Sequence, residues 1–243
     1  MELTVLGRYG PYPRAGGACS GYLVRENQTT LLLDCGAGVL GRLLSQCRLG
    51  DIDAILLSHL HYDHCSDVAV LRYALEQLGA RGDVVTPLPL YTPEGPQDAH
   101  RLFSYPVFDV RAETDGQSVR IGAFTVTFRA MEHPVPSFGM DIVSESGKRL
   151  FYTGDTAYFA GLPACCAGAD ALLADTCFVD SDDRGQTLVH MTARQAGRLA
   201  KEAGVRQLFC THLWGGGDTE ETVKKEVDIP AATVVQELGH YVI

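Results

Sequence analysis

The sequence predicts an α/β fold in which two mixed β-sheets pack face to face with helices on the outside, an αββα sandwich. Short runs rich in Leu, Ile and Val recur along the chain, and several are too continuously apolar to have a face in water. Helical patterns lie between these runs, as expected when helices cover sheets. Strands are expected at residues 3–6, 22–25, 30–33, 54–57, 88–91, 124–130, 149–153, 171–174 and 207–210.

The clearest predicted helix begins after Thr192. Thr192 can cap the helix with Gln195 three residues later, and Gly204 then ends it. Its apolar face is formed by Ala196, Leu199, Ala200 and Ala203. Other helices are expected at residues 39–47, 68–78 and 220–226, whereas the Gly-rich and Pro-rich segments 7–21 and 86–96 are expected to be loops. No Gly-Lys-Ser/Thr follows the glycines of the first segment, which excludes a P-loop.

Composition limits the classes of protein to consider. The 243 residues, 46% of them hydrophobic, suffice for one buried core, and no composition shift divides them, so a single domain, 1–243, is expected. The net charge of −10 argues against extensive nucleic-acid binding, because phosphate contacts need a basic surface. Without a long apolar run or a secretory pattern, a soluble, cytoplasmic protein with no membrane partner is expected. The eight cysteines form no C-x-x-C pair and are expected to be reduced.

Four residues of types that commonly bind metals follow the strand predicted at 54–57: His59, His61, Asp63 and His64. In an extended segment His59 and His61 point the same way, because alternate residues share a face. Three imidazoles and a carboxylate in six residues need a shared partner when they are buried, and a borderline-soft divalent cation is the natural one. The cluster therefore predicts a metal site.

This cluster resembles a motif of the metallo-β-lactamase superfamily, and the family's other motifs follow in the expected order. Asp34 matches the first motif. His133, in Met-Glu-His-Pro, matches the third, and Asp155, in Thr-Gly-Asp-Thr, matches the fourth. His212, in Thr-His-Leu, matches the fifth. The resemblance covers essentially the whole chain and implies the metallo-β-lactamase fold.

The resemblance also implies a centre of two divalent metal ions. The ligands it assigns are His59, His61 and His133 to one ion, Asp63, His64 and His212 to the other, and Asp155 to both. Asp34 would orient a ligand rather than bind a metal. Two cations about 3.5 to 4 Å apart lower the pKa of a shared water and supply hydroxide at neutral pH. Zinc suits these ligands best, with manganese and iron as alternatives.

A second pair of motifs resembles those of the ribonuclease Z-like branch. Asp175, in Ala-Asp-Thr-Cys-Phe, stands where that branch has a glutamate, and His190 begins His-Met-Thr-Ala, with Met191 replacing a small polar residue. The resemblance implies that His190 assists the scissile phosphate, as proton donor or as transition-state stabiliser, and that Asp175 orients it. Asp63, His190 and Asp175 are thus the candidate catalytic residues. The alternative is that His190 merely precedes a helix.

A small phosphodiester is the expected substrate, either a cyclic nucleotide or a short nucleic-acid end. His133 and Asp155 are 155 − 133 = 22 positions apart, enough for strands at 138–143 and 150–153 but not for the arm that grips transfer RNA in that branch. The resemblance is therefore to a small bacterial hydrolase without this arm. Three alternatives stay open: a lactone, thioester or ester hydrolase on the same metals, a transfer-RNA 3′-end endonuclease, and a non-catalytic metabolite-binding relative. A homodimer is a further expectation, because members of the branch often dimerise.

The loop 7–21 is expected to line the entrance of the site with Tyr9, Tyr12 and Arg14, of which Arg14 is a candidate to pair with a phosphate. Ordinary loop residues are the alternative. Trp214 and the glycines 215–217 are expected to form a mobile rim beside the metal site. His100 and His240 stand in no motif and are expected to be structural.

Overall fold

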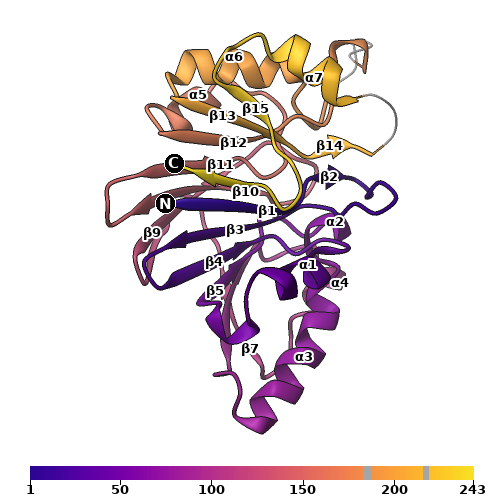
Figure 1. Ribbon diagram of the computed structural model, residues 1–243, viewed down its shortest axis with the longest axis vertical. Helices are drawn as coiled ribbons and strands as arrows, with labels where there is room; N and C mark the ends of the chain where they lie inside the picture. Colours follow the sequence, from indigo (N-terminus) through magenta and orange to yellow (C-terminus); the bar gives the residue numbers. More distant parts are fainter. Residues whose placement is uncertain (183–187, 216–218) are drawn as a thin grey trace.

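The computed structural model describes residues 1–182, 188–215 and 219–243. Within these residues, two seven-stranded sheets pack against each other and helices cover their outer faces (Figure 1). The predicted αββα sandwich is therefore confirmed. None of the helices in these ranges combines the length and apolar character that crossing a bilayer requires.

The first sheet is built from the N-terminal part of the chain and closed by the last strand. Its order is β16 (His240–Val242), β1 (Glu2–Gly7), β3 (Gly21–Glu26), β4 (Thr29–Leu33), β5 (Ala54–Leu56), β6 (Leu88–Thr92) and β7 (Phe108–Ala112). Strands β4 to β7 run parallel. The helical segments of this half are α1 (Val39–Gln46), the 3-10 helix η1 (Leu49–Asp51), α2 (Tyr62–Cys65), α3 (Val68–Arg81) and α4 (Gln97–His100).

The second sheet combines an antiparallel meander with parallel strands. Its order is β15 (Ala232–Val234), β13 (Gln207–Thr211), β12 (Ala171–Asp175), β11 (Arg149–Tyr152), β10 (Phe138–Ser144), β9 (Phe124–Ala130) and β8 (Ser118–Ile121). Strands β11, β12, β13 and β15 run parallel. The helical segments here are α5 (Leu162–Cys166), the 3-10 helix η2 (Asp180–Asp182), α6 (Ala193–Ala203) and α7 (Thr219–Val227).

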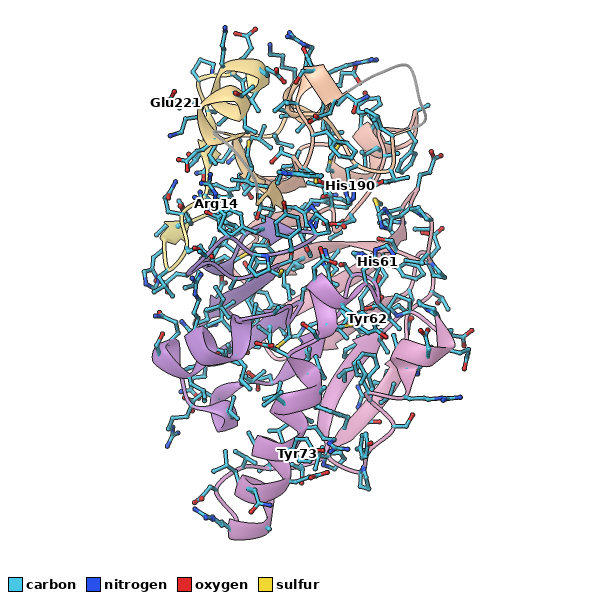
Figure 2. All side chains as sticks on the ribbon, turned by 90° about the vertical axis from the view of Figure 1, so that its right-hand side faces the viewer. Arg14, His61, Tyr62, Tyr73, His190 and Glu221 are labelled. Atoms are coloured by element: carbon cyan, nitrogen blue, oxygen red, sulfur yellow. The ribbon has the colours of Figure 1, made fainter. Side chains whose placement is uncertain are left out.

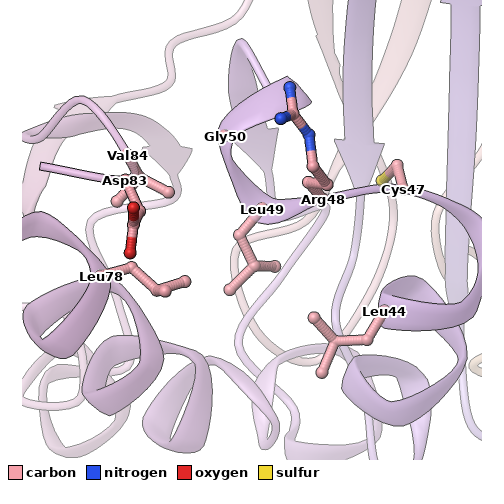
Figure 3. Close-up of a pocket in the computed structure, with 8 residues that line it drawn as sticks. All are labelled: Leu44, Cys47, Arg48, Leu49, Gly50, Leu78, Asp83 and Val84. Carbon is pink, nitrogen blue, oxygen red and sulfur yellow. The ribbon is translucent and has the colours of Figure 1, made fainter. Parts of the chain in front are cut away.

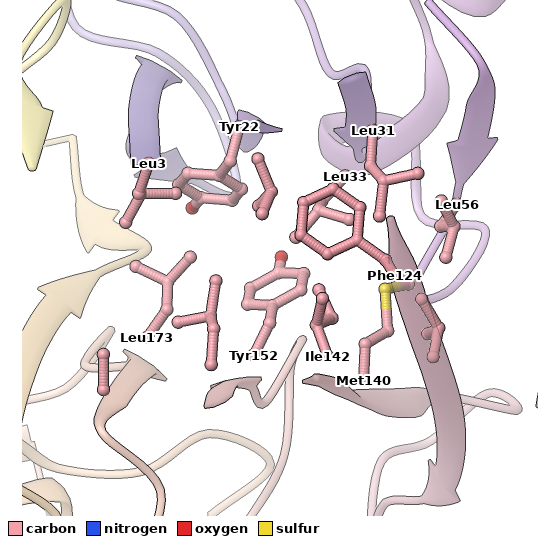
Figure 4. Close-up of a cluster of buried hydrophobic side chains, with 14 of the residues drawn as sticks. Leu3, Tyr22, Leu31, Leu33, Leu56, Phe124, Met140, Ile142, Tyr152 and Leu173 are labelled. Atoms are coloured by element: carbon pink, nitrogen blue, oxygen red, sulfur yellow. The ribbon is translucent and has the colours of Figure 1, made fainter. Parts of the chain in front are cut away.

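The main core lies between the two sheets. Leu31 and Leu33 of β4 face Phe124 and Met140 of the opposite sheet (Figure 4), while Leu32 between them packs in the cluster under the helices. All five residues of β4 are buried because both faces of the strand are covered. The continuous apolar runs of the sequence are explained by this double coverage.

Helix α6 forms as the sequence predicts. The hydroxyl of Thr192 accepts a hydrogen bond from the backbone N–H of Gln195 (3.2 Å), and the side chain of Gln195 accepts one from the N–H of Thr192 (2.9 Å). Gly204 ends the helix in the left-handed region, at φ 65°. Both capping signals are thus confirmed.

All nine expected strands form, so the loop prediction for 86–96 is wrong where the strand also expected at 88–91 is present, and the loop prediction for 7–21 is wrong in part. Segment 86–96 contains β6, where Pro89 pairs with Asp109 of β7 and lies beyond the residues paired with β5, so its missing N–H breaks no pairing on that side. Segment 7–21 contains the short strand β2 (Tyr9–Gly10), which pairs with β14 (Leu213–Trp214). The prediction also missed the edge strands β7, β8, β15 and β16, whose exposed, mixed residues carry little apolar signal.

All eight cysteines, each within the described ranges, are free thiols, and six are buried, so no disulfide supports these parts of the fold. His100 Nε2 lies 3.0 Å from the carbonyl oxygen of Pro93, and His240 Nδ1 lies 3.0 Å from the hydroxyl of Thr4. The first contact ties α4 to the loop after β6, and the second ties the edge strand β16 to β1, in keeping with structural roles.

Candidate metal centre

The candidate site lies where parallel strands of both sheets end. Asp34 directly follows β4, and His59 lies three residues beyond β5. From the other sheet, Asp155 follows β11, Asp175 ends β12 and His212 follows β13. Because the carboxyl ends of parallel strands meet at one sheet edge, these five positions, far apart in sequence, come together.

Three histidines and one aspartate form the first ligand group. Nε2 of His59 lies 3.0 Å from Nδ1 of His61, and Nε2 of His133 lies 3.2 Å from that same Nδ1. Oδ2 of Asp155 lies 3.5 Å from Nε2 of His59. Their ligand atoms are close enough together to hold one metal ion.

Asp155 also belongs to a second ligand group, with Asp63, His64 and His212. Its Oδ1 lies 3.3 Å from Nε2 of His64, and its Oδ2 lies 3.3 Å from Nε2 of His212. Oδ2 of Asp63 lies 3.2 Å from Nε2 of His212. Asp63 and His64 reach this position because the short helix α2 turns the chain after His61. The structure therefore brings together all seven side chains that the family resemblance assigns as ligands.

Hydrogen bonds to neighbouring groups orient two of these imidazoles through their Nδ1 atoms. Nδ1 of His64 donates to Oδ2 of Asp34 (2.8 Å), and Nδ1 of His133 donates to the carbonyl of Val189 (3.0 Å). Asp34 in turn accepts hydrogen bonds from the N–H of Ser58 (2.7 Å) and the hydroxyl of Tyr152 (2.5 Å). A fixed Nδ1–H leaves Nε2 as the free ligand atom, which is the usual arrangement around a metal.

Ser58 and Tyr152 were not among the site residues predicted from the sequence. Ser58 has a local signal, because it directly precedes the first histidine of the cluster. Tyr152 has none, since its contact with Asp34 spans 118 positions and depends on how the two sheets pack.

Two buried polar atoms point to a cation at this position. Nε2 of His64 and Oδ1 of Asp155 are buried and lie 3.3 Å apart, yet neither makes a hydrogen bond of acceptable geometry to a described residue. Leaving such atoms unsatisfied costs about 1 to 3 kcal/mol each. A divalent metal would coordinate both, so the residues present fit the metal that the family implies.

The electrostatics divide the histidines into two kinds. Burial lowers the pKa of His59, His61 and His133, which favours neutral imidazoles with a lone pair to donate. Burial opposes the charged forms of His64 and His212 as well, but Asp155 and neighbouring acids raise both pKa values well above normal. The same negative charge would also favour a divalent cation beside these two rings.

His190 and Asp175 lie beside the two ligand groups. Nδ1 of His190 donates to Oδ2 of Asp175 (2.8 Å), and Oδ1 of that buried carboxylate accepts from the N–H of Cys177 (3.0 Å). The His190 ring lies 5.2 Å from the ring of His133 and 5.1 Å from that of His212, one from each group. Burial would lower the pKa of His190, but Asp175 and Asp155 raise it, favouring the protonated ring.

Figure 2 shows His61, Tyr62 and His190 on one face of the molecule. Nε of Arg14 donates to the carbonyl of Gly215 (3.2 Å), so its contact with a substrate phosphate stays a prediction. Tyr9 does not line the entrance as expected: it is buried, and its hydroxyl accepts from Arg8 (3.1 Å). Of the predicted glycine rim, residues 216 and 217 lie outside the described ranges.

A separate pocket of about 420 Å³ lies among α1, the 3-10 helix η1 and the end of α3 (Figure 3). It is lined by Leu44, Cys47, Arg48, Leu49, Gly50, Leu78, Asp83 and Val84. None of the candidate ligands belongs to this lining.

Comparisons with known proteins identify the family of this chain. The family model described as "Beta-lactamase superfamily domain" matches residues 29–213, more than half of the chain. The "Probable metallo-hydrolase YhfI" of Bacillus subtilis is 34% identical over 88% of this chain and 87% of its own length. Its crystal structure gives a TM-score of 0.91 at 31% identity, covering 99% of this chain and 98% of that one. Ribonuclease Z of Methanopyrus kandleri is 28% identical, over 98% of this chain and 96% of its own. The chain therefore belongs to the metallo-β-lactamase superfamily, as a metallo-hydrolase with relatives of the ribonuclease Z type.

Proposed function

We propose that residues 1–243 form one dinuclear hydrolase domain that cleaves a small phosphodiester, such as a cyclic nucleotide or a short nucleic-acid end. The observation that carries this proposal is the position of His190. Its ring contacts one histidine from each ligand group and is held by the buried carboxylate of Asp175. A protonated imidazole there suits the charge that develops when a phosphodiester is cleaved.

The two ligand groups would each hold one divalent cation, with Asp155 shared between them. We propose His59, His61 and His133 as ligands of the first and Asp63, His64 and His212 of the second. Bound there, two cations supply a water of lowered pKa and neutralise charge on the phosphate oxygens. Zinc is the proposed metal because imidazoles dominate the ligands, with manganese or iron as alternatives.

The roles of this chain's own side chains follow from their contacts. Asp175 occupies Nδ1 of His190, so the proton available to a substrate is the one on Nε2. The water oxygen forms a new bond to phosphorus while the ester P–O bond breaks, and the electron pair of that bond stays on the leaving oxygen. That oxygen takes the Nε2 proton of His190, and the proton lost by the water passes to solvent. Asp63 helps to orient the water as a hydrogen-bond acceptor. The products are a phosphomonoester and an alcohol.

The proposal of a small substrate rests on the short segment between His133 and Asp155. A simple hairpin of β10 and β11, closed by a turn at Gly147, occupies this span. No additional helix or strand emerges between the two strands, all of whose residues are described. Together with the charge of −10, this favours a small substrate that needs no extended basic surface.

The proposal is tested with purified protein loaded with Zn²⁺ or Mn²⁺ and bis-p-nitrophenyl phosphate as substrate. We expect metal-dependent release of p-nitrophenol, and a loss of about 100-fold or more in kcat for His190→Ala at unchanged metal content. Protein that ignores phosphodiesters but opens lactones or thioesters would refute the phosphoryl assignment. Bound metal without turnover of either class would indicate a non-catalytic relative.

A transfer-RNA 3′-end endonuclease is the second candidate, favoured by the 28% identity to the ribonuclease Z of Methanopyrus kandleri over nearly the whole of both chains. A precursor transfer RNA with a short 3′ trailer separates the two candidates. Cleavage of this precursor at a kcat/KM above that for a cyclic nucleotide would favour the second.

A further inference from the structure

Beside the metal centre, two short strands bring distant residues together. β2 runs parallel to β14, with Tyr9 opposite Leu213 and Gly10 opposite Trp214. Gly10 lies directly against the ring of His212, since a Cβ built on Gly10 would stand only 1.9 Å from Nε2 of that ring. The backbone of β2 therefore passes next to Nε2 of His212, the atom that faces the other members of the second ligand group.

Tyr12 lies two positions after Gly10, and Trp214 lies two positions after His212. The two aromatic rings contact each other beside the metal centre. Their ring centroids are 6.2 Å apart and the ring planes are inclined by 73°. Despite this contact, Tyr12 is 48% and Trp214 41% exposed. The two rings thus remain partly accessible while in contact with each other, so a planar ligand could reach the pair.

The two chain segments that carry the pair also contact each other. Gly215 fits closely against Tyr12, because a Cβ at Gly215 would lie 2.8 Å from the Tyr12 carbonyl oxygen and 3.1 Å from its ring. Arg14 donates to the carbonyl of Gly215 (3.2 Å), which joins the far end of the loop to the same segment. These contacts join the two segments that carry the rings, and a binding surface organised in advance has less conformational entropy to lose on binding.

We propose that Tyr12 and Trp214 form a stacking platform for the nucleobase of the substrate, which makes a nucleoside phosphodiester the preferred class. This inference rests on the proposed function, because the phosphate must sit at the metal centre for its nucleoside to reach the rim. Bases stack on aromatic side chains without sequence-specific hydrogen bonds and without a basic surface, which suits an acidic chain. The platform would discriminate nucleoside phosphodiesters from simple alkyl ones.

The chain offers a direct readout, because Trp214 is its only tryptophan. Fluorescence excited at the red edge of tryptophan absorption therefore reports on this ring alone. Zinc-loaded protein is titrated with adenosine 5′-monophosphate and, in parallel, with ribose 5-phosphate, which carries the same phosphate but no base. We expect saturable quenching by the nucleotide only. An equal response to both ligands, or a response to neither, overturns the platform.

Two matched variants test whether nucleotide binding depends on the ring of Tyr12. Tyr12→Leu should weaken nucleotide binding about tenfold, the scale of one base stacked on one aromatic ring. Tyr73→Leu is the control, because Tyr73 is also largely exposed, at 58%, but lies on α3 and stacks on Arg72. Equal losses in the two variants, or no loss in Tyr12→Leu, contradict the proposal.

Kinetics separate the platform from the proposed function. The preference for a nucleoside 3′,5′-cyclic phosphate over the same cyclic phosphate of 1-O-methylribose should fall about tenfold in Trp214→Leu through KM, and largely recover in Trp214→Phe. If Trp214→Leu slows both substrates equally, the residue supports the metal centre and the platform is wrong. If the wild-type protein hydrolyses neither substrate, the phosphodiesterase proposal fails, and the fluorescence titration still decides whether a base binds at the rim.

Discussion

Oδ2 of Asp34 lies 2.8 Å from Nδ1 of His64, and neither residue is accessible to solvent. The carboxylate holds the imidazole so that Nε2 faces the second ligand group. Asp34 itself is fixed by Ser58 and Tyr152, so the orientation of a candidate metal ligand depends on residues from both sheets.

Asp34→Asn should therefore weaken metal binding at the second group about 10- to 100-fold, the usual result of removing the partner of a ligand histidine. An amide is nearly the same size but accepts less strongly and can turn its NH₂ toward Nδ1. The affinity is measured by zinc titration against a competing chelator. Asp109→Asn, on the exposed carboxylate that pairs with Arg111, is the control and should match wild type. Unchanged zinc affinity in Asp34→Asn would remove this residue from the metal centre.

Gly10→Ala should displace the ring of His212, because the added Cβ would stand 1.9 Å from its Nε2. We expect loss of about half of the bound metal, with the first ligand group retained. Gly41→Ala is the control: Gly41 lies in α1, and a Cβ there meets nothing within 4 Å. That variant should gain about 0.4 to 1 kcal/mol of stability and keep its metal. The metal content of both variants is measured by metal analysis, and their stability by thermal unfolding. Full metal content in Gly10→Ala would contradict the prediction.

Metal affinity should fall as the pH falls from 8 to 6. The carboxylates around His64 and His212 raise the pKa of both rings well above normal, so protons compete with the metal at neutral pH and below. Each proton displaced changes the apparent affinity about tenfold per pH unit below the ring's pKa. Zinc titrations at several pH values measure the slope. An affinity that is constant across this range would exclude these two rings as ligands.

Glu113 should make the protein less stable as the pH rises. Its side chain is only 3% exposed, neither oxygen has a hydrogen-bond partner among the described residues, and burial, with a smaller contribution from Asp34, raises its pKa well above normal. In the unfolded chain the carboxyl loses its proton at its ordinary pKa, whereas in the folded chain it keeps the proton to a higher pH. Between the two values, each pH unit costs the folded state about 1.4 kcal/mol.

Glu113→Gln removes this titration, so the variant should be more stable than wild type at pH 7 to 8 and similar to it near pH 4. Urea unfolding at each pH gives the difference between the two proteins. Glu145→Gln is the control, because Glu145 is half-exposed and pairs with Arg120 at the surface. A stability difference that does not grow with pH would show that Glu113 is not held protonated.

The sequence by itself determined the ligand cluster, the order of the motifs and the strands with both faces covered. These features are local: His59, His61, Asp63 and His64 stand within six residues, and the capping box of α6 spans four. A strand that is covered on both faces has a continuously apolar sequence, and this pattern is why the nine expected strands could be predicted. The edge strands escaped detection because a strand with exposed, mixed residues resembles a loop.

Only the tertiary structure decided which distant residues meet. Tyr152 reaches Asp34 across the sandwich, Gly10 packs against His212, and Tyr9, expected at the entrance, is buried beside Arg8. The sequence separations in the first two pairs exceed one hundred positions. No local pattern encodes such pairs, because they arise when two sheets pack and the ends of their parallel strands converge. The sequence could therefore predict a metal site and expect Tyr12 and Trp214 near its entrance, whereas the contact between their two rings was visible only in the fold.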